Sequence, residues 1–171
     1  MVLKAKDFGV PQNRQRIYIV LWRKDLNFNF TYPAPSGIKT RVGDILELKP
    51  ESKFTISDRL WRGHQRRKAD NALNGKGFGF GLVSPDSEYT NTISARYYKD
   101  GSEILVSQKN KNPRKITTRE AARLQGFPEK FMINKSDVQA YKQFGNSVSV
   151  PVIKLIADKI NEKMKGAQNE S

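Results

Sequence analysis

The chain has 171 residues, which is enough for one ordinary domain or two small ones. Its formal net charge is +14, from 31 lysines and arginines against 17 aspartates and glutamates, and this excess favours a polyanionic partner, nucleic acid first, over a surface that is charged only for solubility. The sequence has no cysteine, which excludes disulfides, thiolate metal sites and a thiolate nucleophile within it, and its one histidine, His64, gives little basis for any other metal site.

Residues 1–30 begin with a turn-rich segment and continue into a predicted strand. Charged residues at positions 4, 6 and 7 interrupt any signal-peptide core, and no run approaches the roughly 18 apolar residues of a membrane span, so we expect a soluble intracellular protein. Residues 16–22 form an apolar, β-branched and aromatic run, which predicts a strand buried on both faces. Such a strand needs parallel neighbours and covering helices, and the chain offers few candidates for either.

The middle of the chain is basic, dotted with glycine and predicted to hold short strands. Residues 33–37 mark a loop, and residues 42–46 are compatible with a short helix. Residues 90–98 and 103–106 look like strands on either side of Lys99-Asp100-Gly101, so they predict a hairpin with an Asp-Gly turn.

Three helices are predicted in the last third of the chain. Thr117 and Glu120 form a capping-box pattern, and the Gly-Phe-Pro sequence at 126–128 ends that helix. Ser136 can cap a second helix over residues 138–144. Pro151 suits the first turn of a third helix, whose apolar residues recur at helical spacing, and the polar tail 165–171 is expected to fray.

Four segments carry recognisable patterns. Residues 10–20 read Val-Pro-Gln-Asn-Arg-Gln-Arg-Ile-Tyr-Ile-Val, residues 115–128 read Lys-Ile-Thr-Thr-Arg-Glu-Ala-Ala-Arg-Leu-Gln-Gly-Phe-Pro, and residues 141–151 read Tyr-Lys-Gln-Phe-Gly-Asn-Ser-Val-Ser-Val-Pro. In this order they resemble the eighth, ninth and tenth conserved motifs of DNA (cytosine-5)-methyltransferases. Residues 90–104, with Thr92-Ile93, resemble the end of that family's target-recognition domain. The ordered set spans nearly the whole chain.

The resemblance implies an α+β fold class. We expect a small target-recognition domain of short strands and loops, plus an incomplete edge of a Rossmann-like α/β domain that uses S-adenosylmethionine. The expected divisions are the end of the catalytic domain at 1–30, a linker at 31–54, the target-recognition domain at 55–114, returning helices at 115–164 and a polar tail at 165–171.

The eighth-motif segment supplies the candidate catalytic residues. Gln12, Arg14 and Arg16 alternate, so in an extended chain they point to one side, where two guanidinium groups can clamp a phosphate or a base carbonyl. The resemblance places them beside a flipped cytosine in a supporting role, with Arg16 nearest the base. From the residues alone, surface arginines flanking a core strand are the simpler interpretation.

The two helical motifs supply different candidates. The resemblance implies that Asn146, Ser147 and Val148 contact S-adenosylmethionine, although a plain helix C-cap explains the same residues equally well. Arg119 and Arg123 share a helix face, and we expect them to be internal salt-bridge partners rather than DNA contacts.

The densest basic cluster lies at residues 59–68 and is followed by a glycine-dotted segment at 74–82. Cationic side chains around an aromatic residue predict a phosphate-positioning patch, and alternating glycines let a backbone approach a groove closely. A solvated helix face and a tight structural hairpin are the alternatives. The predicted DNA-binding residues are Arg59, Arg62, Arg66, Arg67, Lys68, Lys76, Thr92, Ser94 and Arg96, with Tyr97 and Tyr98 as further candidates for reading the target.

The family's chemistry needs parts that this sequence lacks. Its enzymes attack carbon 6 of a flipped cytosine with a thiolate, and the Pro-Cys, Glu-Asn-Val and glycine-rich cofactor motifs are absent here. We hypothesise that the chain recognises double-stranded DNA and completes an active site for methylation of cytosine carbon 5, as in restriction-modification in the bacterial cytoplasm. It is expected to be inactive without an N-terminal methyltransferase portion or a complementary subunit. A stand-alone sequence-specific DNA-binding module and an unrelated basic RNA-binding protein remain alternatives.

Overall fold

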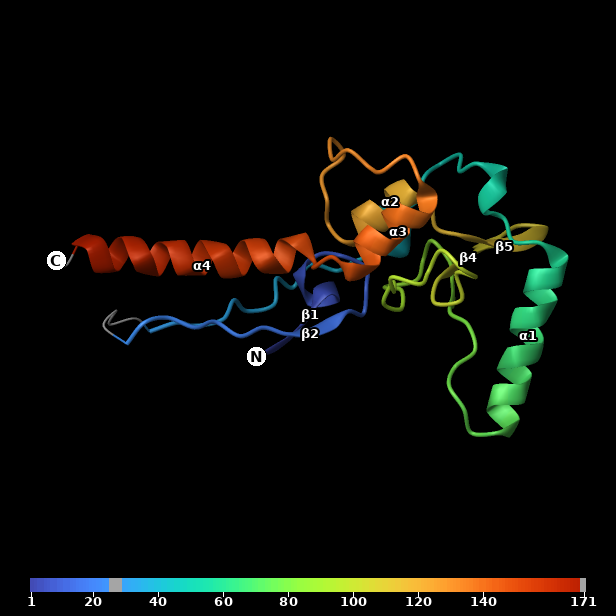
Figure 1. Ribbon diagram of the computed structural model, residues 1–171, viewed down its shortest axis with the longest axis horizontal. Helices are drawn as coiled ribbons and strands as arrows, with labels where there is room; N and C mark the ends of the chain where they lie inside the picture. The colour runs from blue at the N-terminus through green and yellow to red at the C-terminus, as the bar shows by residue number, and fades with distance from the viewer. Residues whose placement is uncertain (25–28, 170–171) are drawn as a thin grey trace.

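The computed structural model describes residues 1–24 and 29–169, and the molecule is elongated (Figure 1). At one end α4 (Val150–Asn169) runs beside two extended stretches of chain, residues 18–24 and 29–35. At the other end stands α1 (Asp58–Leu73). Two shorter helices, α2 (Thr118–Leu124) and α3 (Asp137–Asn146), lie between these ends.

The described strands form two small sheets. β1 (Val2–Lys4) pairs antiparallel with β2 (Gln15–Ile17). In the second sheet, β3 (Leu82–Val83) is parallel to β4 (Leu105–Gln108), which is antiparallel to β5 (Lys111–Lys115). Three 3₁₀ helices, at Ala5–Phe8, Val42–Ile45 and Ser52–Phe54, complete the elements. This mixture of helices with small sheets confirms the predicted α+β class.

The strand predicted at residues 16–22 is wrong in its extent and its burial. Regular pairing ends at Ile17, and the neighbouring strand is antiparallel rather than parallel. Tyr18 and Val20 pack toward α4, whereas Ile17, Ile19 and Leu21 are 72%, 75% and 87% exposed. The reason is that a two-stranded ribbon with a helix on one side leaves its other face uncovered within the described residues.

The hairpin predicted around Asp100 is also wrong. Residues 95–100 form turns, and the observed hairpin joins β4 to β5, with Asn110 in the left-handed region at φ 55°. The cause is Tyr97, whose ring is fully buried. Its hydroxyl donates to the carbonyl of Ile104 at 2.6 Å and accepts from the amide of Ile116 at 2.8 Å, so this segment coils into the core instead of pairing as a strand.

The predicted helix starts are confirmed. The Thr117 hydroxyl accepts from the Glu120 amide, the reciprocal capping-box bond is present, and the Ser136 side chain accepts from the amide of Gln139. α4 continues to Asn169, so the tail predicted to fray is helical as far as that residue. No helix among the described residues is long and apolar enough to cross a membrane.

The main core lies between the β4–β5 hairpin and the pair α2 and α3. Because its members come from residues 45–144, it joins segments that the sequence assigned to a linker, a recognition domain and returning helices. The domain boundaries themselves stay a prediction. The largest fully buried side chains in this core are Ile93, Tyr97, Ile104, Ile116, Leu124, Tyr141 and Phe144.

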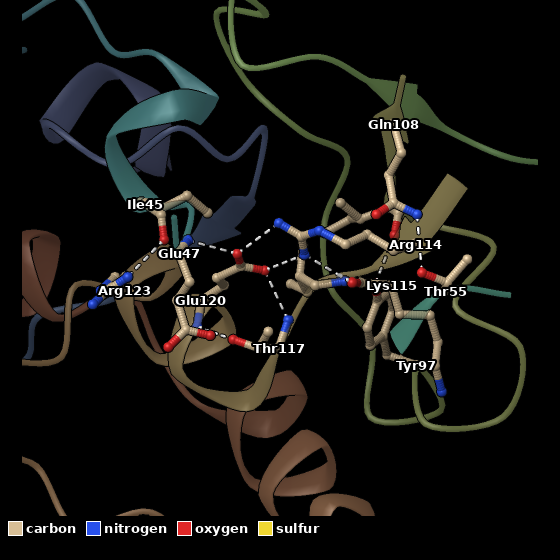
Figure 2. A network of polar contacts seen from close by, with 12 residues as sticks. Ile45, Glu47, Thr55, Tyr97, Gln108, Arg114, Lys115, Thr117, Glu120 and Arg123 are labelled. Atoms are coloured by element: carbon tan, nitrogen blue, oxygen red, sulfur yellow. Dashed lines mark hydrogen bonds and ion pairs between the residues drawn. The ribbon is translucent and has the colours of Figure 1, made fainter. Parts of the chain in front are cut away.

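A network of polar contacts at this core joins β5, α2 and the chain after residue 45 (Figure 2). Arg123 forms an ion pair with Glu129 at 2.7 Å and donates to the carbonyl of Ile45 at 3.2 Å, which confirms the expected internal salt bridge. Arg119 instead donates to the carbonyl of Phe131 at 3.1 Å. Both arginines therefore brace the loop that follows α2.

Candidate functional site

Residues 11–14 lie against residues that are far away in the sequence. The amide of Thr90 donates to the carbonyl of Pro11 at 2.8 Å, and the amide of Asn13 donates to the carbonyl of Thr90 at 2.9 Å. The Thr92 hydroxyl donates to the carbonyl of Asn13 at 2.8 Å. The eighth-motif segment and the recognition segment are thus held side by side by their backbones.

Gln12 extends this connection to the helices. Its side chain is fully buried, with Nε2 donating to the carbonyl of Leu124 at 3.0 Å and Oε1 accepting from the amide of Ile93 at 3.1 Å. Next to it, Gln125 Nε2 donates to the carbonyl of Phe144 at 2.8 Å. We call residues 11–14, 90–95, 124–125 and 144–148 the central junction.

Arg14 lies inside this junction with 5% of its surface exposed. Its Nη1 donates to the carbonyl of Ile93 at 3.3 Å, and its Nη2 donates to the carbonyls of Gly145 at 3.2 Å and Ser147 at 2.6 Å. Burial, and secondly the charge of Arg16, lower the pKa of the Arg14 guanidinium. Because a guanidinium titrates so high, Arg14 stays a cation held by carbonyl oxygens.

The prediction that Gln12, Arg14 and Arg16 point to one side is wrong. Gln12 and Arg14 point inward, whereas Arg16 is exposed and donates to the carbonyl of Gln15 at 2.6 Å. The cause is that the side chains of Gln12 and Arg14 are drawn inward by buried carbonyl and amide groups, whereas all three residues of β2, Arg16 among them, are exposed. Of the three residues, Arg16 alone is therefore directed toward solvent.

The tenth-motif turn presents its candidate residues at the surface. Asn146 is exposed, Val148 is 46% exposed, and Ser147 is half-buried with its hydroxyl donating to the carbonyl of Phe144 at 2.8 Å. Gly145 lies so close to the recognition segment that a Cβ there would be 2.3 Å from the backbone carbon of Ser94. The turn is therefore fixed next to residues 94–95.

The predicted DNA-binding residues of α1 divide into two groups. Arg59, Arg62 and Arg66 are exposed and line an open hollow. Arg67 contacts His64 Nδ1 at 2.6 Å and Asp100 at 3.1 Å, so it is tied to the turn beside α1. The Lys68 ammonium lies 4.7 Å from the centre of the Phe80 ring and is held over it.

The remaining candidates in the recognition segment also divide by exposure. Lys76 and Arg96 are exposed, and the side chains of Thr92 and Ser94 bond within the protein, Ser94 to Glu103. Tyr97 is wrong as a DNA-reading candidate because it is fully buried. Tyr98 is half-buried, with the Lys142 ammonium 5.4 Å from the centre of its ring.

The structure brings the eighth-motif, tenth-motif and recognition segments together at the central junction, while α1 stands at the far end of the molecule (Figure 1). The contacts of Arg14 could not be predicted from the sequence, because hydrogen bonds across 79 and 131 residues leave no local pattern. Within residues 1–24 and 29–169, no group of three or more histidine or acidic side chains is placed to hold a metal ion.

Comparison with known proteins agrees with this arrangement. The family model for C-5 cytosine-specific DNA methylases matches residues 1–162. The chain is 67% identical over 162 residues to the type II methyltransferase M.SsoII of Shigella sonnei, covering 93% of this chain and 43% of that protein. It is 65% identical over 167 residues to M.NlaX of Neisseria lactamica, covering 97% and 51%. The chain thus spans about half the length of the curated relatives it matches.

Solved structures show the same fold at lower identity. The S. pombe Dnmt2 methyltransferase superposes with a TM-score of 0.70 at 21% identity, over 96% of this chain and 57% of that one. The Entamoeba histolytica methyltransferase EhMeth gives a TM-score of 0.71 at 20% identity, over 96% and 53%. From the family match and the close relatives, the chain belongs to the C-5 cytosine-specific DNA methylase family.

Proposed function

We propose that this chain recognises double-stranded DNA and completes an active site for methyl transfer from S-adenosylmethionine to carbon 5 of cytosine. The observation that carries the proposal is the central junction, where the eighth-motif, tenth-motif and recognition segments meet through buried hydrogen bonds. In this proposal the eighth-motif segment faces the target base, the tenth-motif turn faces the cofactor, and the recognition segment faces the DNA. The hydrogen bonds of the central junction hold these three segments together.

The chemistry requires a nucleophile that this chain does not supply. Carbon 6 of cytosine needs a strong nucleophile, for which an activated thiolate is suited, and the sequence has no cysteine. The base must also leave the duplex stack. Arg16, with its exposed guanidinium, is placed to donate to a base carbonyl or a phosphate, while Gln12 and Arg14 hold the framework behind it.

The tenth-motif turn fits the methyl donor. Asn146, Ser147 and Val148 offer an amide, a hydroxyl and an apolar side chain within one turn, a mixture that suits a ligand with both polar and apolar parts. When bound, S-adenosylmethionine supplies the methyl group. The role of these residues is to hold and orient it.

An exposed apolar face favours a partner that bears the remaining motifs. Val2 and Ile17 are paired neighbours and are 54% and 72% exposed, and Ile19 and Leu21 continue the same face. Exposed apolar groups in this density mark interaction surfaces. Because the relatives are about twice as long as this chain, the partner proposed for this face is an N-terminal methyltransferase portion or a complementary subunit.

The test is complementation. The chain is mixed with the N-terminal portion of the Shigella sonnei relative, duplex DNA and S-adenosylmethionine labelled on its methyl group. We expect label in cytosine with the mixture and none with either piece alone. Methylation by this chain alone contradicts the need for a partner, and an assembled but inactive complex contradicts the completion of an active site. Sequence-specific duplex binding without methylation would support the stand-alone binding module instead.

A further inference from the structure

We infer that Arg14 is a positioning residue that holds the DNA-facing segment 92–96 and the cofactor-facing turn 145–148 in one fixed relation. The two ligands are those of the proposed function, so the inference rests on it for their identity. The geometry of the brace is independent of that proposal.

One guanidinium connects the two segments directly. Nη1 donates to the recognition segment through the carbonyl of Ile93, and Nη2 donates to the turn through the carbonyls of Gly145 and Ser147. The planar guanidinium fixes the angle between its two Nη groups, so the two segments are held in direction as well as in distance. Lysine has a single ammonium on a flexible stem and cannot reproduce this fork.

The surroundings leave little room for the segments to shift. Gly145 packs against the backbone of Ser94 and Ala95 at a distance that admits no Cβ. Gln12 adds a second connection, from the amide of Ile93 to the carbonyl of Leu124. Arg14 is nevertheless the residue that reaches the turn itself, and the exposed side chains of Asn146 and Val148 project from that turn.

Positioning of this kind affects the rate of the reaction more than ground-state binding. Methyl transfer needs the donor carbon and the flipped base at near-attack distance, and a displacement of about 1 Å can lower the rate by about 10²-fold. Loss of the brace lets the cofactor turn and the recognition segment drift relative to one another. Saturating concentrations of either ligand do not restore that relation.

The experiment compares Arg14→Gln and the milder Arg14→Lys with a matched core variant, Val106→Ala, in the chain assembled with the N-terminal portion. Val106 is buried in the same core but bonds to none of the junction residues through its side chain. For the Arg14 variants we expect kcat at saturating DNA and S-adenosylmethionine to fall by about 10²-fold, with much smaller changes in KM. Val106→Ala should lower Tm and leave kcat unchanged.

Hydrogen exchange on this chain alone provides a reading that does not depend on activity. Arg14→Lys should accelerate hydrogen exchange at the amides of residues 92–96 and 145–148. Val106→Ala should not accelerate exchange at those segments more than elsewhere. The inference is overturned if the Arg14 variants raise only KM, if Val106→Ala lowers kcat equally, or if exchange at the two segments is unchanged. An inactive wild-type assembly counts against the proposed function, while the exchange result still decides whether Arg14 forms the brace.

Discussion

Arg114 of β5 and Glu120 of α2 form a two-pronged ion pair inside the core, with Nη1 to Oε2 at 2.7 Å and Nη2 to Oε1 at 2.8 Å (Figure 2). The side chains are 5% and 0% exposed. The carboxylate also accepts from the backbone amides of Thr117 and Glu47, each at 2.8 Å. One residue therefore caps α2, binds β5 and holds the chain that follows the 3₁₀ helix Val42–Ile45.

Removal of the Glu120 carboxylate should strongly destabilise the fold. Glu120→Ala leaves the Arg114 cation buried without its partner, and breaking a buried pair in this way costs about 3–5 kcal/mol. The free energy of unfolding from urea titration measures the change. The control is Asp86→Ala, which breaks the exposed pair with Arg41 and should cost less than about 1 kcal/mol. Similar losses of unfolding free energy in the two variants would contradict the claim that burial makes the Arg114–Glu120 pair the more costly one to break.

Two glycines should respond to alanine in opposite directions. Gly145→Ala places a Cβ against the backbone of Ser94, so we expect lower Tm and faster hydrogen exchange in the turn. Gly63 lies inside α1 with nothing within 4 Å of the added Cβ, and Gly63→Ala should stabilise the protein by up to about 1 kcal/mol. Thermal unfolding of both variants tests the pair. A neutral Gly145→Ala would contradict the close packing at the central junction.

His64 should make the stability depend on pH below neutrality. Its Nδ1 faces Arg67 at 2.6 Å and its Nε2 faces the carbonyl of Asp100 at 3.2 Å. Arginine is a donor only, so Nδ1 accepts and Nε2 carries the proton of a neutral ring. Burial lowers the pKa of His64, while the carbonyl and carboxylate of Asp100 oppose this and Arg67 reinforces it.

The sign of the effect follows from the lowered pKa. The unfolded chain takes up the proton near its ordinary pKa of about 6.5, before the folded protein does, so folding is favoured fully above that pH and progressively less below it. We predict that Tm of the wild type falls as the pH drops below about 6.5, and that His64→Gln removes most of this slope. Equal slopes in the two proteins would exclude His64 as the cause.

The α1 arginines should contribute salt-dependent DNA binding. Each phosphate contact adds about 0.9 to the slope of log affinity against log salt concentration, so replacing Arg59, Arg62 and Arg66 with alanine should lower the slope by up to about 2.7. Fluorescence anisotropy with a labelled duplex measures it. The control removes the same charge from α4, at the opposite end of the molecule, through alanine at Lys154, Lys159 and Lys163. Equal changes in both variants would indicate general attraction rather than a contact by α1.

Local chemistry made the helices predictable from sequence, and distant partners made the rest unpredictable. The hydroxyls of Thr117 and Ser136 accept hydrogen bonds from amides three residues further along the chain, so these helix caps can be predicted from local sequence. Tyr97 looked like a strand residue because aromatic residues favour strands, but its hydroxyl bonds to Ile104 and Ile116 in the core. Tertiary contacts override such propensities.

The same limit applies to the candidate site. The resemblance identified the segments that meet at the central junction, which no periodicity could show. It did not reveal that Gln12 and Arg14 face inward while Arg16 faces solvent, because distant hydrogen-bond partners decide the direction of the first two side chains. The exposure of Ile19 and Leu21 was missed for a related reason, since an apolar run does not say which of its faces the chain itself covers.

The exposed apolar face formed by Ile17, Ile19 and Leu21 should matter for assembly and little for this chain's own stability. Ile17→Ser, Ile19→Ser and Leu21→Ser together remove side chains that are already in water, so Tm should change little. Assembly with the N-terminal portion should be lost, as sedimentation velocity can show. The control variant is Leu3→Ala. Because Leu3 is buried beside α4, this variant should lower Tm by leaving a cavity, in contrast to the triple variant. Normal assembly of the triple variant would contradict the proposed docking face.

The most direct test of the central proposal is the transfer of labelled methyl groups to duplex DNA by this chain, by the N-terminal portion and by their mixture. We predict label at carbon 5 of cytosine with the mixture only, and its loss when Arg16→Ala is used in place of the wild-type chain. Label incorporated by this chain alone, or no label from a mixture that has formed a stable complex, would contradict the proposal.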